Sequence, residues 1–225
     1  MLLKELYQLW RKDNSLSEAV TDSHNMLEYT FEMFQESILS LRQSDEKDLE
    51  ISVYEKDQKV NEYIRVVRRK VLQYLAVTGG LNIIPGLILS SIVIDIERIG
   101  DYTKNIADLA IAHPKRLATG DFEDDYLKIE RTILSVFKEL IPILKESDKD
   151  AAAKLIEQNY WVLKKCDDII NILVKEGASS VIKDAATCAL YTRYLKRTAS
   201  HLYNIASSVV NPYEHIGFKS ENEEI

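Results

Sequence analysis

The sequence predicts an all-α protein built as two tandem antiparallel three-helix bundles, with six long helices and a short N-terminal helix. The chain has 225 residues but only seven glycines and four prolines, and an all-β chain of this length needs many more turn residues. Apolar residues recur every three or four positions over long stretches, which is typical of amphipathic helices. Residues 90–112 also have an altered copy at residues 191–210, which indicates an internal duplication.

Three long helices are expected in the first half of the chain. Helical spacing of apolar residues predicts the first over residues 18–42 and the second over residues 47–77. The second ends at Gly79, because glycine is favoured where a helix terminates. The third is expected to start after Asn82, which can cap it, and to end before Pro114.

The second half repeats this order. The fourth helix is expected over residues 122–146, although Pro142 inside the pattern should kink the helix or end it early. The fifth is expected as one helix over residues 148–176. The sixth should begin near Ser179 and end at Asn211. Short loops between such helices favour antiparallel bundles.

The pattern divides the chain into four parts. A change in composition near residues 118–120 marks the boundary between the two halves. The predicted parts are a leader helix, a first repeat, a second repeat and a disordered tail, at residues 1–15, 16–117, 118–218 and 219–225.

Composition and charge exclude several classes of function. With 46% hydrophobic and 29% charged residues the chain is globular. A net charge of −7 argues against a nucleic-acid-binding protein, which normally carries a basic stripe. The longest apolar run, residues 81–94, is too short to span a membrane. One basic cluster is expected on a solvated helix face or, alternatively, in contact with an acidic partner or a membrane surface: Arg65, Arg68, Arg69 and Lys70.

No catalytic motif is present. The four histidines form no spaced pair, and the chain lacks the ExxH, HExxH, GxSxG, GxGxxG and P-loop patterns. Cys166 and Cys188 lack zinc-site spacing and are expected to be buried thiols in a reducing cytoplasm. No nucleophile–base pair can be named, so we expect a protein that is not an enzyme.

A polar stripe on the third helix is the best candidate for a site. Glu97, Asp101 and Asn105 are four residues apart, and each step of four turns a helix by only about 40°. The main apolar stripe points roughly the opposite way, so these side chains need not lie in the core. The plainer interpretation is a solvated acidic face.

The second helix offers a matching pair that could complete a metal site. In an antiparallel bundle Asp57 and Asn61 can meet Glu97 and Asp101 as a four-oxygen cluster. Oxygen ligands suit hard cations such as Mg²⁺, Ca²⁺, Mn²⁺ or Fe³⁺.

The corresponding cluster of the second half is degenerate. Its members are Asp167, Asn171, Lys196 and Ser200. The Lys196 ammonium can pair with Asp167 and fill the space of a cation, so we expect any metal in the first half only.

The run DIERIGD at residues 95–101, with Arg98 at its centre and Asn105-Ile106-Ala107 behind it, closely resembles the hallmark of the PhoU family of phosphate-transport accessory proteins. A second, weaker copy contains Arg197 and Asn204. The resemblance covers nearly the whole chain, about residues 17–218. It implies two repeated three-helix bundles, which agrees with the periodicity.

The resemblance also implies a function. Family members are cytoplasmic, non-catalytic regulators that act on the phosphate ABC transporter and, in many bacteria, on a membrane sensor kinase. Their metal ligands are E(D)xxxD pairs, which correspond here to Asp57, Glu97 and Asp101. Asn61 and Asn171 stand where the family usually has aspartate, and Lys196 and Ser200 remove a second pair.

The leading hypothesis is therefore a metal-binding adaptor that holds down a phosphate ABC transporter through its ATPase or membrane component. Its first repeat would carry Fe, Zn, Mn or Mg, and the protein would be cytoplasmic, at the inner face of the membrane when bound, and compatible with a homodimer. The alternative is a metal-free helical interaction module without a phosphate role. A metal-dependent phosphohydrolase is the least favoured hypothesis.

Overall fold

The computed structural model describes residues 14–43, 52–78, 83–113, 115–176 and 184–218. These residues form helices and contain no strand, which confirms the predicted all-α class. The α-helices are α2 (Asn14–Arg42), α3 (Ser52–Thr78), α4 (Ile83–Ala112), α5 (Glu123–Glu146), α6 (Lys149–Asn159), α7 (Trp161–Glu176) and α8 (Ala185–Val210), with the 3-10 turns η1 (Gly120–Phe122) and η3 (Tyr213–His215).

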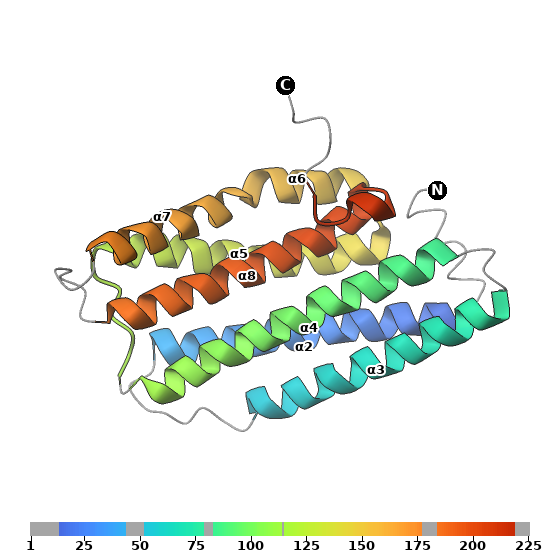
Figure 1. Ribbon diagram of the computed structural model, residues 1–225, viewed down its shortest axis with the longest axis horizontal. Helices are drawn as coiled ribbons and strands as arrows, with labels where there is room; N and C mark the ends of the chain where they lie inside the picture. The colour runs from blue at the N-terminus through green and yellow to red at the C-terminus, as the bar shows by residue number, and fades with distance from the viewer. Residues whose placement is uncertain (1–13, 44–51, 79–82, 114, 177–183, 219–225) are drawn as a thin grey trace.

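The long helices lie side by side in two groups. One group holds α2, α3 and α4, and the other holds α5, α6, α7 and α8 (Figure 1). The groups meet where α4 packs along α8 and α2 packs on α5. None of the described helices is long and apolar enough to cross a membrane.

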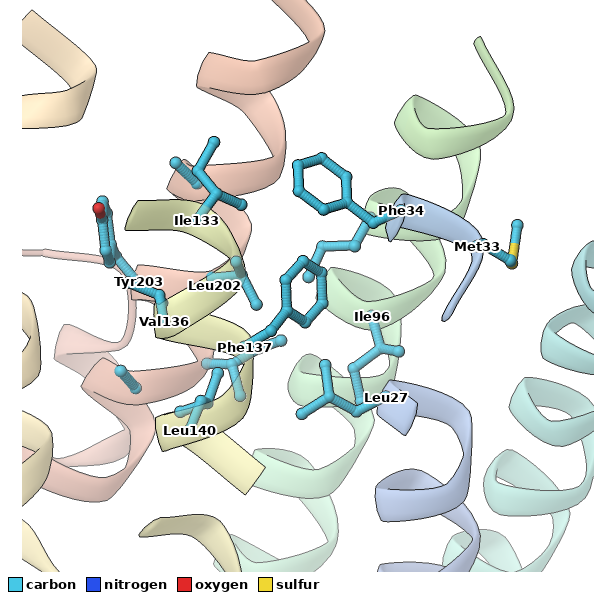
Figure 2. Close-up of a cluster of buried hydrophobic side chains, with 14 of the residues drawn as sticks. Leu27, Met33, Phe34, Ile96, Ile133, Val136, Phe137, Leu140, Leu202 and Tyr203 are labelled. Carbon is cyan, nitrogen blue, oxygen red and sulfur yellow. The ribbon is translucent and has the colours of Figure 1, made fainter. Parts of the chain in front are cut away.

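The buried side chains of both groups form one continuous hydrophobic cluster. Figure 2 shows Phe34 of α2 beside Phe137 of α5, and their ring centroids are 5.4 Å apart. Ile96 of α4 and Leu202 of α8 lie in the same cluster, and all four side chains are fully buried. Burying an aromatic or aliphatic side chain of this size contributes about 1.5–3 kcal/mol, so the contact between the groups adds substantially to stability.

A buried polar network joins the two groups where the chain passes from one to the other. Arg42, at the end of α2, donates to Glu130 Oε1 over 2.9 Å, to the Leu117 carbonyl over 2.8 Å and to Glu123 Oε1 over 2.7 Å. Tyr191 of α8 donates to the same Glu130 oxygen over 2.7 Å. Burial raises the pKa of Glu130, and the charge of Arg42 opposes that shift. The buried pair of Arg42 and Glu130 therefore connects α2, α5, α8 and the segment at Leu117.

The fifth helix was predicted as one continuous helix, and this prediction is wrong because the helix is interrupted at Tyr160. Helix α6 ends at Asn159 and α7 begins at Trp161. The Tyr203 hydroxyl of α8 donates to the Asn159 carbonyl over 2.6 Å. The Leu163 N–H then bonds to the Tyr160 carbonyl instead of continuing the i to i−4 ladder. A contact with α8 thus interrupts the helix.

Pro142 was expected to kink its helix or end it early, and the early end does not occur. Helix α5 continues through Pro142 to Glu146 and stops at Ser147, which has a left-handed φ of 53°. Proline removes one helical hydrogen bond. Leu140, Ile143 and Leu144 on either side are buried, and their packing holds the helix together.

The remaining differences concern helix ends. Helix α2 includes Asn14, so the predicted boundary after residue 15 falls inside this helix. The expected start of the second helix at residue 47 lies outside the described residues. Most of the leader helix, the start of the sixth helix near Ser179 and the tail at residues 219–225 lie outside the described residues. The division into two repeats stays a prediction.

Candidate functional site

The predicted ligands of the first half lie where α3 packs against α4. Asp57 and Asn61 come from α3, and Asn61 Nδ2 donates to Asp57 Oδ2 over 3.3 Å. Glu97 and Asp101 come from α4. The Asp57 side chain is 13% exposed, against 25% for Glu97 and 35% for Asp101. The polar stripe therefore follows the seam between two helices and is only partly open to solvent.

Lys104 of α4 occupies the middle of this seam, and the sequence interpretation missed it. Its Nζ lies 3.0 Å from Asp57 Oδ2 and 3.7 Å from Asp101 Oδ1. Burial alone would lower the pKa of Lys104, but the hydrogen bond to Asp57 and the charges of Asp57 and Asp101 outweigh it and raise that pKa. Lys104 stands three residues after Asp101, so helical spacing was the signal that could have found it.

Further contacts extend the same seam. Tyr54 of α3 donates to Asp108 Oδ1 over 2.6 Å, and this hydrogen bond is the largest cause that raises the pKa of Tyr54 to about 12. We call the whole set the α3–α4 polar row: Tyr54, Asp57, Asn61, Glu97, Asp101, Lys104 and Asp108.

Glu97 is the least compensated carboxylate of the row. Partial burial and the negative charges of Asp101 and Asp57 raise the pKa of Glu97, while Arg98 and Arg68 oppose the shift. Arg98 lies 3.7 Å from Glu97 Oε2 and 3.5 Å from Asp101 Oδ2. Because the Arg98 side chain is 54% exposed, these pairs are weak.

The second-half cluster contains the ion pair that its sequence predicts. Lys196 Nζ of α8 lies 2.6 Å from Asp167 Oδ1 and 2.7 Å from Asp167 Oδ2 of α7. Asn171 is exposed on α7. Ser200 is half-buried and lines a cavity of about 60 Å³ together with Asn204.

The hallmark residue Asp95 has a structural role between the two groups of helices. Its Oδ1 accepts from Asn204 Nδ2 over 3.2 Å and lies 2.6 Å from His201 Nδ1, and both partners are on α8. Tyr102 stacks on the His201 ring at 5.7 Å between centroids. Asn204 therefore connects the helices here. Asn105 and Arg197 are half-buried on α4 and α8.

As placed, the α3–α4 polar row does not fit a bound metal ion. Asp57 Oδ2 already receives the Lys104 ammonium and the Asn61 amide. Within the described part of the chain, no group of three or more His, Cys, Asp or Glu side chains could hold a metal. The predicted ligands Asp57, Asn61, Glu97 and Asp101 thus stay a prediction, as does the degenerate site of the second half.

Comparison with known proteins finds a family similarity in the first group of helices. Residues 24–110 match the family model of the PhoU domain. The matched residues resemble a PhoU domain. The match contains the whole α3–α4 polar row and confirms the family resemblance seen in the sequence. A comparison with curated proteins finds no match.

The fold agrees with two solved PhoU structures. The crystal structure of PhoU from Pseudomonas aeruginosa superposes with a TM-score of 0.76 at 20% identity, covering 87% of this chain and 95% of that one. The phosphate transport system regulatory protein PhoU from Streptococcus pneumoniae gives 0.71 at 16% identity, covering 86% and 92%. At such low identity the likeness concerns the fold, and it extends beyond the matched PhoU domain to the second group of helices.

Proposed function

We propose that this chain is a non-catalytic regulator of phosphate uptake and intracellular phosphate homeostasis, which binds a phosphate ABC transporter and lowers its activity. The observation that carries the proposal is the match of residues 24–110 to the PhoU domain. It is supported by the similar fold of two proteins named PhoU, one of them described as a phosphate transport system regulatory protein.

Binding, and not chemistry, is the mechanism that the side chains favour. Both cysteines are buried, and burial raises the pKa of Cys166 to about 12 and that of Cys188 to about 11, which makes them poor nucleophiles at neutral pH. An adaptor of this kind acts by preferring one state of the transporter. Its differential affinity for the less active state shifts the population toward that state.

The outer face of α3 is the surface that we propose for this contact. Arg65 and Arg69 are exposed there without an ion pair in the described residues, although the chain as a whole carries a charge of −7. Exposed aliphatic side chains lie on the same half of α3, with Leu72 at 67% and Val77 at 82% exposure. Arginine together with aliphatic surface is typical of protein interfaces, so an acidic and apolar face of the ATPase or membrane component would fit it.

The proposal is tested by deletion and complementation. Without the protein, phosphate uptake and intracellular phosphate should rise in high-phosphate medium, and the wild-type protein should restore both to their normal level. Arg65→Glu/Arg69→Glu should fold normally but fail to restore control. Lys138→Glu/Lys154→Glu, with two exposed lysines on α5 and α6, is the matched charge-reversal control and should restore it. Unchanged uptake after deletion would contradict the proposal.

A metal-free interaction module without a phosphate role is the second candidate. The observation that favours it is the neutralisation of Asp57 by Lys104 and of Asp167 by Lys196. Affinity capture of the wild-type protein separates the two candidates, because recovery of transporter components, or of a sensor kinase, supports the regulator.

A regulator of the transporter would also have to be cytoplasmic and present at the inner face of the membrane. If the protein forms a homodimer, light scattering would give twice the mass of the chain.

A further inference from the structure

We propose that lysine ammonium groups replace metal ions as the resident cations of this protein, Lys104 in the first half and Lys196 in the second. This inference rests on contacts within the chain and is independent of the phosphate role. It concerns what holds the carboxylates of two helix seams in place.

Lys104 lies between carboxylates of both helices. An ionised carboxylate that is largely removed from water needs a counter-charge, and Asp57 is only 13% exposed. The ammonium at 3.0 Å supplies that charge and also lies 3.7 Å from Asp101. One cation from α4 thus serves a carboxylate from each helix, which is the bridging role that a metal ion would otherwise have.

The second half of the chain repeats this pairing of aspartate and ammonium. In both halves an aspartate on one helix faces an ammonium on the next, and Lys196 contacts both oxygens of Asp167. In both halves an asparagine follows four residues after the aspartate, as Asn61 and Asn171. Lys104 and Lys196 do not stand at corresponding positions of α4 and α8. Each half therefore neutralises its aspartate with a lysine from a different place in the helix.

The balance of charge around Asp57 also favours an ammonium over a metal ion. A divalent or trivalent metal needs several carboxylates, whereas an ammonium carries a single positive charge and donates three hydrogen bonds. Asn61 places a neutral amide beside Asp57 where an aspartate would add a second negative charge. Its Nδ2 donates to Asp57 Oδ2 over 3.3 Å. A neutral amide in this place suits a monovalent cation and weakens any site for a multivalent one.

A metal ion and Lys104 therefore compete for the same Asp57 oxygen. Two positive charges within a few ångströms of each other repel strongly where water is partly excluded. We expect the wild-type protein to fold and keep its stability without metal, and metal binding to become strong only after the ammonium is removed and the missing carboxylate is supplied.

The test measures metal content and thermal stability of purified protein after EDTA treatment and exposure to Mn²⁺. The wild type should retain no stoichiometric Mn²⁺, and its Tm should change neither with EDTA nor with Mn²⁺. Lys104→Gln/Asn61→Asp should retain Mn²⁺ and gain about 5–10 °C in Tm at a concentration one hundred times the Kd.

Lys70→Gln is the matched control. Lys70 lies 2.8 Å from Asp22 and 3.1 Å from Glu18, so the substitution exposes a pair of carboxylates of the same kind outside the α3–α4 polar row. It should gain no Mn²⁺ affinity. Lys196→Gln alone should lower Tm without adding metal.

Stoichiometric Mn²⁺ in the wild type, lost in Glu97→Gln/Asp101→Asn, would overturn the inference and support the metal site predicted from the sequence. Equal Mn²⁺ retention by the wild type and by Lys104→Gln/Asn61→Asp would overturn it as well. If the double variant does not fold, as judged by its helical circular dichroism, Lys104→Gln alone decides, because its Mn²⁺ affinity must then exceed that of the wild type. All these results are obtained without the transporter, so they stand apart from the outcome of the uptake experiment.

Discussion

At the scale of single residues, the surroundings of some titratable side chains hold them in one protonation state. His24 on α2 is the clearest case. Burial and the nearby charge of Lys145 lower its pKa from 6.5 to about 4, and Glu28 opposes the shift. The folded protein therefore keeps His24 neutral at pH values at which the unfolded chain protonates it.

This difference predicts how stability changes with pH. Between pH 6.5 and 4 the unfolded chain binds a proton at His24 that the folded state does not bind, so the free energy of unfolding falls as pH decreases. The contribution is about 2–3 kcal/mol. Urea unfolding at intervals from pH 7 to pH 4 should show a shallower loss in His24→Gln than in the wild type. Equal slopes in both proteins would contradict the expectation.

Lys104 shows at the same scale why the candidate site was predicted only in part. Helical spacing placed Asp57, Asn61, Glu97 and Asp101 on facing surfaces, because that depends on periodicity alone. Which cation neutralises these side chains depends on how far α3 and α4 are offset along their axes. That offset places the Lys104 ammonium 3.0 Å from Asp57, and it is a property of packing that one helix pattern does not contain.

At the scale of helices, the close approach of α4 to its neighbours is set by two glycines. A methyl group added at Gly100 would meet Val60 at 3.5 Å and Thr30 at 3.6 Å, which is ordinary contact. A methyl group added at Gly86 would meet Val71 at 3.1 Å and Leu75 at 3.3 Å, which is tight. The two positions therefore have different tolerance for the same substitution.

We expect Gly100→Ala to be neutral or to stabilise the protein by up to about 1 kcal/mol, because alanine favours the helical conformation more than glycine does. Gly86→Ala should gain the same helix propensity, but the crowding of the new methyl group against its neighbours should offset that gain. The free energy of unfolding of Gly86→Ala should therefore be lower than that of Gly100→Ala. Urea unfolding of the two variants side by side measures the difference. A more stable Gly86→Ala would contradict this account of the packing.

Helices also show where sequence patterns are sufficient and where they are not. The range of α4 follows from local spacing, because this helix buries apolar residues along its whole length. The break between α6 and α7 depends on the Tyr203 hydroxyl, 44 positions after the Asn159 carbonyl that it contacts. The continuation of α5 through Pro142 depends on burial of its flanking residues. Both are effects of tertiary packing that override local preference.

At the scale of the whole molecule, Arg42 holds the two groups of helices together. It is 6% exposed and contacts Glu130, Glu123 and the Leu117 carbonyl. Removing one member of a buried ion pair leaves the other charge without compensation. Arg42→Met should therefore lower the free energy of unfolding by about 3–5 kcal/mol.

A double variant tests whether the uncompensated charge of Glu130 causes this loss of stability. Arg42→Met/Glu130→Leu removes both charges and should recover part of the lost stability, whereas Arg131→Met on the exposed face of α5 should change it by less than about 0.5 kcal/mol. Hydrogen exchange should show α3 and α7 becoming less protected together in Arg42→Met. Loss of protection in one group alone would mean that the groups unfold independently.

The packing of α4 on α8 gives the two groups a property that separate chains would lack. An interface between two subunits dissociates on dilution, because association is second order in concentration. Here the same kind of contact forms within one polypeptide, where the effective concentration of each partner is fixed by the connecting chain. The joined unit therefore stays assembled however few copies are present, and its abundance can vary without changing its state of assembly.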